Sequence, residues 1–187
     1  MTDKTSYSRI KKEDCVGVII DVQEKLFPFI SENEKLTKNI IRLIEGFKIL
    51  NIPILVTQQY TKGIGETIKP IKEALGEFSH IEKLSFSCCG EPNFTESLKK
   101  LGKKYIILAG IESHVCVMQT ALDLIDTGYQ PVLIEDCVSS RNLNDKKFAV
   151  KRMKSAGAII STFESILFEL TVVSGTEQFK AISKLVK

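Results

Sequence analysis

The sequence lacks an apolar stretch that could cross a membrane. None of its runs approaches the roughly 18 to 20 consecutive apolar residues that a membrane-spanning helix needs. The segment from Met1 to Asp14 also lacks the hydrophobic core of a secretory signal. We therefore expect a protein that has no membrane partner and that works in the cytoplasm.

The sequence also lacks a large excess of one charge and any linker that would divide it into domains. The chain has 26 Lys and Arg against 23 Asp and Glu, a formal charge of +3. These basic residues are dispersed, whereas nucleic-acid-binding proteins gather them on one face, so we expect no nucleic-acid partner. No repeat, low-complexity tract or Pro/Gly/Ser-rich linker interrupts the 187 residues, of which 43% are hydrophobic. We expect one globular domain over residues 1–187.

Histidine is rare, with two residues, and the five cysteines are an odd number. A chain of this length needs no disulfide framework, so an odd count favours free thiols in a reducing compartment. The adjacent Cys88 and Cys89 lack the spacing of metal ligands, and the sequence leaves open whether they contribute to a site. Gly63-Ile64-Gly65 is too short for a dinucleotide fingerprint, so no cofactor is expected.

Short apolar runs alternate with amphipathic stretches along the chain. The run 16–20 ends at Asp21 and is typical of a strand buried on both faces of a parallel sheet. Further strands are predicted at 53–57, 105–109, 131–134 and 158–161, with an ambiguous one near Ile81. Helices are predicted at 36–50, 66–75, 113–126 and 145–156.

This alternation predicts an α/β fold with three layers, helix, sheet and helix, around a doubly wound, mostly parallel sheet of about six strands. Gly128 and Gly157 follow two of the helices at positions where a left-handed cap is favoured. Ser174 and Glu177 have the spacing of a capping box, which predicts a last amphipathic helix.

Three residues are candidates for chemistry because ligands bind beyond the carboxyl ends of parallel strands. Asp21 closes the first strand, Lys83 falls in an irregular segment, and Cys116 begins the helix that follows the strand 105–109. If Ser113 caps that helix, the helix dipole would stabilise a thiolate at Cys116. The alternative is that Cys116 is a small buried apolar residue.

A cysteine nucleophile usually relies on a histidine base. His114 lies two residues before Cys116 and would point away on a helix, and His80 could approach only through a loop. A carboxylate is therefore the expected base. Asp21 fits, because a charge at the end of a buried strand needs compensation, although it could instead be a turn or cap residue. Lys83 is uninformative alone, but beside both it would lower the pKa of the thiol and hold the aspartate ionised.

Five sequence motifs extend over nearly the whole chain. They are IIDVQ at 19–23 with FP at 27–28, EKLSF at 82–86, GIESHVCV at 110–117 with QTA at 119–121, DCVSSR at 136–141, and TFES at 162–165. Together they resemble the isochorismatase-like cysteine hydrolases, which include nicotinamidases, N-carbamoylsarcosine amidase and ureido-amide hydrolases. Within that family the likeness is to small isochorismatase-domain proteins of uncertain substrate.

The resemblance implies a catalytic triad of Asp21, Lys83 and Cys116. It also implies a non-proline cis peptide between Ile111 and Glu112, with the backbone amides of Glu112 and Cys116 forming an oxyanion hole. The implied reaction is attack of the Cys116 thiolate on an amide-type carbonyl, a thioester intermediate, and its hydrolysis by water that Asp21 activates. Isochorismatases proper differ at the cysteine position, so Cys116 favours the amidase branch. The resemblance further implies a homo-oligomer.

One departure from the family bears on metals. Nicotinamidases carry an Asp-x-His motif after the second strand, where this chain has VTQQY at 56–60. Without carboxylate or imidazole ligands there, no metal site is expected and nicotinamide is a doubtful substrate. Gln59, Tyr60 and Phe27 are candidates to line the substrate pocket, or are structural. The segment 136–141 either closes over the site or contacts another subunit.

The leading hypothesis is a metal-independent cysteine hydrolase acting on a small amide, ureide or carbamoyl compound. A non-catalytic scaffold that retains the fold is the alternative, and an intact triad counts against it. A thiol redox protein would use Cys116 without Lys83 or an oxyanion hole.

Overall fold

The computed structural model describes residues 9–187. Residues 1–8, and with them most of the segment for which no secretory signal is expected, lie outside the described residues. The strands are β1 (Cys15–Ile20), β2 (Ile54–Gln59), β3 (Ile81–Lys83), β4 (Tyr105–Ile111), β5 (Gln130–Ser139) and β6 (Ile159–Ser161). They coincide with the five predicted strands and the ambiguous one near Ile81.

All six strands form one parallel sheet, in the order β3-β2-β1-β4-β5-β6. From β1 the chain builds outward through β2 and β3, and then returns to place β4 on the other side of β1. The strand order thus reverses between β1 and β4. In doubly wound sheets, such a switch point opens a crevice beyond the carboxyl ends of the two strands.

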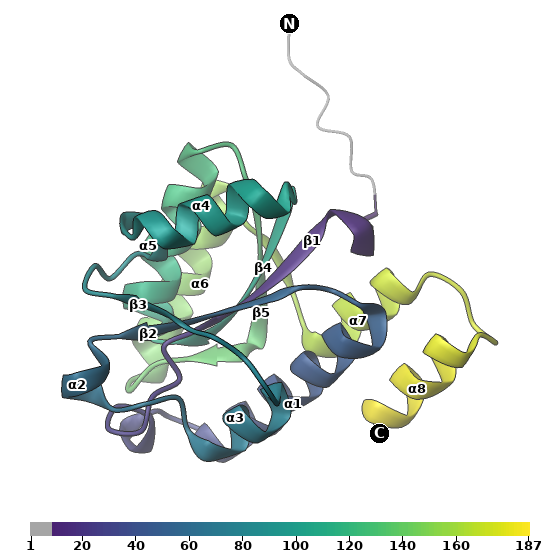
Figure 1. Ribbon diagram of the computed structural model, residues 1–187, viewed down its shortest axis with the longest axis horizontal. Coiled ribbons are helices and arrows are strands. Elements are labelled where there is room, and N and C mark those ends of the chain that lie inside the picture. Colours follow the sequence, from purple (N-terminus) through teal and green to yellow (C-terminus); the bar gives the residue numbers. More distant parts are fainter. Residues whose placement is uncertain (1–8) are drawn as a thin grey trace, which may run out of the picture.

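Helices cover both faces of the sheet, which confirms the predicted three layers (Figure 1). The helices that cover the sheet are α1 (Asn33–Leu50), α3 (Lys69–Leu75) and α7 (Phe163–Thr171) on one side, and α4 (Pro92–Leu101), α5 (Met118–Asp126) and α6 (Leu143–Ala156) on the other. Two more are α2 (Thr61–Ile64) and α8 (Glu177–Leu185). None of the helices within residues 9–187 is long and apolar enough to cross a membrane.

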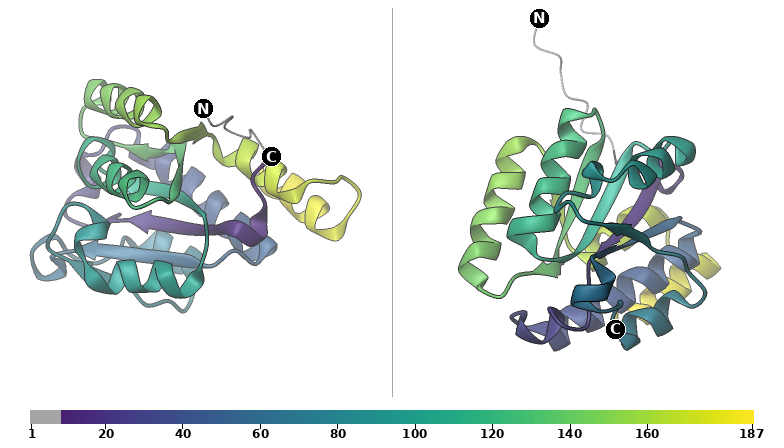
Figure 2. Two further views of the ribbon diagram at one scale, coloured as in Figure 1. Left: turned by 90° about the horizontal axis from the view of Figure 1, so that it is seen from above. Right: turned by 60° about the vertical axis from the view of Figure 1, so that its left-hand side comes forward.

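The last helix, α8, packs against α1 and α7. It protrudes, in yellow, at the end of the molecule from which β1 starts (Figure 2). Lys12, in the 3₁₀ turn before β1 (Lys12–Asp14), donates a hydrogen bond to Gln178 Oε1 at 3.0 Å. The carboxyl ends of the strands therefore lie at the opposite end from α8.

Strand β1 is buried on both faces, as its unbroken apolar run predicts. Cys15 and Ile19 join the core beneath α1 and α7, whereas Val16, Val18 and Ile20 join the core beneath α4, α5 and α6. These two cores clamp β1 and fix the position of the residue that follows it.

Two predicted helix caps are wrong. Ser113 does not cap a helix: residues Ser113–Val117 form one wide π turn before α5, and the Ser113 hydroxyl is buried with no hydrogen-bond partner among residues 9–187. The turn widens because the Val117 amide reaches back to the Glu112 carbonyl at 3.2 Å. Ser174 does not cap α8 either, because Thr176 Oγ1 accepts from the Phe179 amide at 3.1 Å.

Two other boundaries shift. Helix α3 begins at Lys69, three residues after the predicted start, because Thr67 pairs with Gln23 in an isolated antiparallel bridge. Strand β5 continues to Ser139, five residues past its predicted end at 134, after an irregularity in its pairing with β4. Most of the segment 136–141 is therefore strand, and it ends at the same edge of the sheet as Asp21.

Candidate active site

The sheet brings the predicted site residues to one edge. Asp21 follows β1, Gln59 and Lys83 end β2 and β3, and Cys116 lies in the turn after β4. The register pairs Gln59 with Lys83, and pairs the last residue of β1 with both Thr57 and Gly110. The three predicted triad residues therefore meet beside the switch point between β1 and β4.

Asp21 and Lys83 form a buried ion pair. Lys83 Nζ lies 2.6 Å from Asp21 Oδ2, and the two residues are 1% and 2% exposed, respectively. The ammonium also donates to the backbone oxygens of Ser85 at 3.1 Å and Phe86 at 3.0 Å. Burial acts to lower the pKa of Lys83, but the Asp21 carboxylate raises it, and the net shift is upward. Lys83 is therefore a fixed cation.

Thr57 holds the other side of the carboxylate. Its hydroxyl donates to Asp21 Oδ1 at 2.7 Å, and its carbonyl accepts from the Asp21 amide at 3.2 Å. Asp21 adopts a left-handed conformation with φ of 51°, which turns the chain off the end of β1. Thr57 is not among the residues predicted for this site, although its position as a polar residue near the end of the second parallel strand could have identified it.

Cys116 lies in the π turn with 5% of its surface exposed, and its thiol donates to Gln59 Oε1 at 3.4 Å. Burial raises the pKa of the Cys116 thiol, the Asp21 carboxylate raises it further, and Lys83 lowers it to a smaller extent. The expectation that a Ser113-capped helix start would stabilise a thiolate does not hold, because Ser113 is not the cap and the net shift of the thiol pKa is upward. The raised pKa favours a neutral Cys116 thiol in the free protein.

Cys88 lies behind the ion pair in the 3₁₀ turn Cys88–Gly90. Its sulfur is 3.9 Å from Thr57 Oγ1, and its amide donates to Thr120 Oγ1 at 2.9 Å. Thr120 in turn donates to the Cys116 carbonyl at 2.7 Å, so Cys88 helps to position the π turn. Burial raises the pKa of Cys88 to about 12. All five cysteines fall within the described residues and are free thiols there, as predicted.

The peptide bond between Ile111 and Glu112 is cis, as the resemblance implies. The Glu112 carboxylate accepts from both the backbone amide and the Nε of Arg141 at 3.1 Å each. His114 Nδ1 lies 2.9 Å from Ser140 Oγ, so the His114 ring is held at the end of β5. The same two contacts fasten the end of β5 to the turn that carries Cys116.

Gly110, just before the cis peptide, is required by the close approach of β4 to β1. Its φ is +121°, and a Cβ atom at this position would lie 2.1 Å from the carbonyl oxygen of Ile20. No other residue fits there without separating the two strands that hold Asp21 and Cys116.

The remaining candidates have different surroundings. Phe27, in the 3₁₀ turn Phe27–Phe29, packs into the hydrophobic core and is 8% exposed. Tyr60 is 49% exposed, and its amide donates to the Lys83 carbonyl at 3.0 Å. Of the three, Gln59 has a side-chain hydrogen bond with Cys116. His80 is exposed.

The stretch that holds metal ligands in nicotinamidases is occupied by other contacts here. Gln58 binds the hydroxyls of Thr61 and Thr67, and Gln59 accepts from Cys116. Over residues 9–187, no group of three or more His, Cys, Asp or Glu residues lies together as metal ligands would. These side chains do not fit a resident metal ion.

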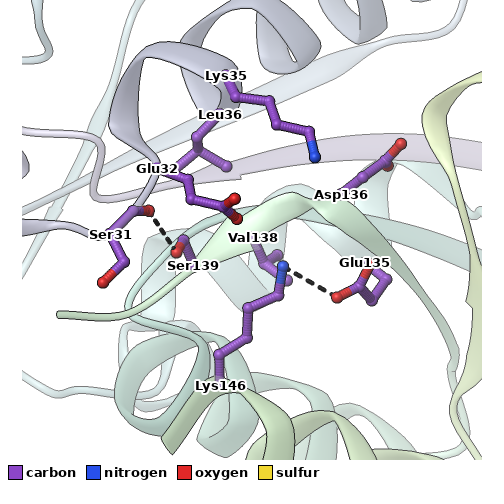
Figure 3. A pocket seen from close by; sticks show the side chains of 9 residues that line it. All are labelled: Ser31, Glu32, Lys35, Leu36, Glu135, Asp136, Val138, Ser139 and Lys146. Atoms are coloured by element: carbon purple, nitrogen blue, oxygen red, sulfur yellow. Dashed lines mark hydrogen bonds and ion pairs between the residues drawn. The ribbon is translucent and has the colours of Figure 1, made fainter. Parts of the chain in front are cut away.

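Two hollows adjoin this edge. One of about 210 Å³ lies between the start of α1, β5 and α6, and Figure 3 shows the ends of Glu32, Lys35 and Lys146 pointing into it. Lys146 pairs there with Glu135 at 2.9 Å. The other, of about 390 Å³, is lined by Lys25, Leu26, Phe29, Gly63, Ile64 and Arg141.

The isochorismatase-domain family model matches residues 15–165. The chain belongs to the isochorismatase family. It is 37% identical over 178 residues to isochorismatase domain-containing protein 2 of Danio rerio, a match that covers 95% of this chain and 89% of that protein.

Solved structures of the isochorismatase fold superpose closely on this chain. The MAR1 ribonuclease of Caenorhabditis elegans is 39% identical with a TM-score of 0.89, over 96% of this chain and 92% of that one. YcaC of Escherichia coli, described as an octameric hydrolase of unknown specificity, is 25% identical with a TM-score of 0.89, over 96% and 89%. Membership of the isochorismatase family supports a hydrolase role for this chain.

Proposed function

We propose that this chain is a metal-independent cysteine hydrolase that cleaves a C–N bond in a small amide, ureide or carbamoyl compound. Cys116 is the proposed nucleophile, Asp21 the proposed base, and Lys83 the cation that keeps Asp21 ionised. The observation that carries the proposal is the buried Asp21–Lys83 pair at 2.6 Å beside a buried thiol. Burying each charge costs several kcal/mol, and the attraction within a buried ion pair often fails to offset this cost. A function in catalysis would explain why the pair persists inside the protein.

The first step is proton transfer from the thiol to Asp21. A neutral thiol is a weak nucleophile, and the raised pKa of Cys116 means that it needs a base at neutral pH. Thr57 and Lys83 each donate to one oxygen of Asp21, which orients the carboxylate for this transfer. In the free protein, Gln59 accepts a hydrogen bond from the thiol and fixes its direction.

The thiolate then attacks the carbonyl carbon, and the carbonyl oxygen becomes negative. The backbone amides of Glu112 and Cys116 are the proposed donors to that oxygen, each worth roughly 3 to 4 kcal/mol in enzymes where such donors have been removed. The C–N bond breaks as Asp21 returns its proton to the leaving nitrogen, which leaves a thioester on Cys116. Asp21 next takes a proton from water, the hydroxide attacks the thioester, and the proton returns to the sulfur.

The proposed substrate is a small molecule in contact with Gln59 and Tyr60. Phe27 has at most an indirect role, because it is buried in the core and supports the loop after β1. Self-association belongs to the same proposal and is supported by the octameric YcaC. Light scattering on the purified chain tests it directly. A cytoplasmic location stays a prediction of the sequence.

The test measures ammonia release and mass change over a panel of small amides, ureides and carbamoyl compounds, with and without a chelator. We expect wild-type turnover that Cys116→Ala abolishes, that Asp21→Asn reduces at least a hundredfold, and that the chelator leaves unchanged. Cys15→Ala is the matched control, because Cys15 is a buried thiol at the opposite end of β1. A covalent adduct on Cys116 in the intact mass would identify the thioester.

Three outcomes would overturn the proposal. No turnover of any compound, with a Cys116 thiol that electrophiles do not modify even at high pH, would favour a scaffold. Cleavage of an RNA oligonucleotide that depends on Cys116, tested because of the name of the C. elegans relative, would replace the amide by a phosphodiester. Mild peroxide oxidation confined to Cys116 without any hydrolysis would favour a thiol redox protein.

A further inference from the structure

Among residues 9–187, three Asp, Glu, Lys, Arg or His residues are buried, and all three lie at the catalytic edge: Asp21, Lys83 and Glu112. The proposed chemistry uses the first two as an ion pair. It uses the backbone amide of Glu112 and gives no role to the Glu112 carboxylate, although only 7% of that side chain is exposed. Burying a carboxylate is unfavourable unless a cation and hydrogen bonds compensate it, so this side chain needs an explanation.

Arg141 supplies the compensating cation from the solvent side. Its Nε lies 3.1 Å from Glu112 Oε1, and 60% of the Arg141 side chain is exposed. The Arg141 backbone amide donates to the same carboxylate oxygen at 3.1 Å. This second hydrogen bond does not depend on the arginine side chain, so it would survive a substitution at position 141. The backbone therefore tethers the two segments, whereas the side chain contributes the positive charge.

The segment that carries Arg141 is itself held in place. Ser31 Oγ donates to the Arg141 carbonyl at 2.7 Å, and the Ser31 amide donates to the Ser140 carbonyl at 3.1 Å. Ser140 Oγ lies 2.9 Å from Nδ1 of His114, which belongs to the turn of the proposed nucleophile. The guanidinium therefore keeps its place over Glu112 through the fold itself.

The Glu112 carboxylate lies close to the charge that the proposed reaction creates. It belongs to the residue whose backbone amide is a proposed donor to the oxyanion. In a site that excludes water, an unpaired carboxylate at this position would repel the negative charge that develops on the substrate oxygen. Arg141 balances the charge of Glu112 as Lys83 balances that of Asp21. Each buried carboxylate of the catalytic edge then has one cation.

We propose that Arg141 is a positioning residue of the oxyanion hole. It orients and neutralises Glu112, so that the Glu112 amide meets the negative oxygen without repulsion from the carboxylate of the same residue. The inference rests on the proposed hydrolase function, because it concerns the oxyanion of that reaction. Arg141 acts through Glu112, and its contribution therefore lies in the rate of the chemical step rather than in substrate binding.

The test uses p-nitrophenyl acetate, an activated ester whose acyl group carries no charge for Arg141 to bind. The Cys116 sulfur bonds to the acyl carbon, the C–O bond breaks, nitrophenolate leaves with the electron pair, and the thiol proton passes to Asp21. We expect Arg141→Gln to slow this acylation at least tenfold at saturating ester, with less than a twofold change in the half-saturating concentration. Arg141→Lys keeps the charge and should stay within about threefold of wild type.

A double variant and a second reagent separate a charge effect from a damaged fold. Glu112→Gln/Arg141→Gln leaves no unpaired charge, so it should be acylated at least fivefold faster than Arg141→Gln. Alkylation by iodoacetamide passes through no oxyanion, so Arg141→Gln should alkylate Cys116 within about twofold of the wild-type rate. Arg152→Gln is the matched control, because it removes the same charge from an exposed position on α6, and it should leave both rates unchanged.

The outcomes separate this inference from the hydrolase proposal. Acylation that Cys116→Ala abolishes, but that Arg141→Gln leaves within twofold of wild type, would overturn the role of Arg141 and leave the hydrolase standing. The same conclusion would follow if Glu112→Gln did not relieve the loss, or if iodoacetamide alkylation slowed as much as acylation. Acylation that persists in Cys116→Ala, or no acylation of the wild-type protein, would overturn the proposed nucleophile and this inference with it.

Discussion

Replacing Lys83 by methionine should strongly destabilise the protein. Methionine keeps the length and apolar volume of the side chain but removes the ammonium that donates to Asp21 at 2.6 Å and to two backbone carbonyls. The Asp21 carboxylate would remain buried, with Thr57 as its one side-chain donor within the described residues 9–187. Removing one partner of a buried ion pair costs about 3 to 5 kcal/mol, a large part of the about 5 to 15 kcal/mol that stabilises most domains.

Urea unfolding followed by circular dichroism at pH 7 measures this cost. Because the two side chains contact each other, the double variant Asp21→Asn/Lys83→Met should lose about 1 to 3 kcal/mol less than the sum of the two single variants. Lys69→Met is the matched control, since Lys69 pairs with Glu73 at 3.8 Å on the surface, and it should change stability by at most about 0.5 kcal/mol. The reasoning would be refuted if the double variant lost as much unfolding free energy as the two single variants together. It would also be refuted if Lys83→Met lost no more unfolding free energy than Lys69→Met.

The pH dependence gives a second check on the same pair. The pKa of Lys83 is raised in the folded protein, so its contribution to stability is fully present below the unfolded lysine pKa of about 10.4 and is lost as the pH rises through the folded value. The gap in unfolding free energy between wild type and Lys83→Met should therefore be constant from about pH 7 to 9 and shrink only above about pH 10.4. A gap that closes near neutral pH would contradict a buried, charged Lys83.

Three other perturbations test the geometry around the pair. In thermal unfolding, Gly110→Ala should destabilise the fold by several kcal/mol more than Gly102→Ala. The Cβ at Gly110 would lie 2.1 Å from a backbone oxygen of β1, whereas the space at Gly102 is open. Equal losses of stability in the two variants would contradict the close approach of the strands. Thr57→Val should cost about 1.5 to 3 kcal/mol by removing a hydrogen bond to a carboxylate, and Thr57→Ser should recover most of it. Alkylation of Cys116 by iodoacetamide, followed by mass spectrometry, should be slower at pH 7 than that of a free thiol. Its rate should keep rising beyond pH 9, since the pKa of Cys116 is raised. Complete labelling within seconds at pH 7 would contradict the raised pKa.

The layers and strands were predictable from local pattern. Unbroken apolar runs such as 16–20 indicate strands buried on both faces, and a period of 3.6 indicates the helices between them. Caps were harder to predict because several residues near a helix start can accept the same amide. Ser174 and Thr176 both precede α8, and the choice between them depends on where the helix packs on α1 and α7.

The sequence alone determined that Asp21 and Cys116 lie beyond strand ends, since each follows an unmistakable strand of a parallel sheet. It could not determine that Lys83 is buried, because the three residues of β3 form a strand only through their pairing with β2. Nor could it determine the protonation of Cys116, which depends on desolvation and on the distance to Asp21. Likewise, Thr57 and Arg141 acquire their partners through contacts between segments far apart in the chain. Local patterns depend on neighbours in sequence, whereas burial, charge pairing and the walls of a pocket depend on neighbours in space.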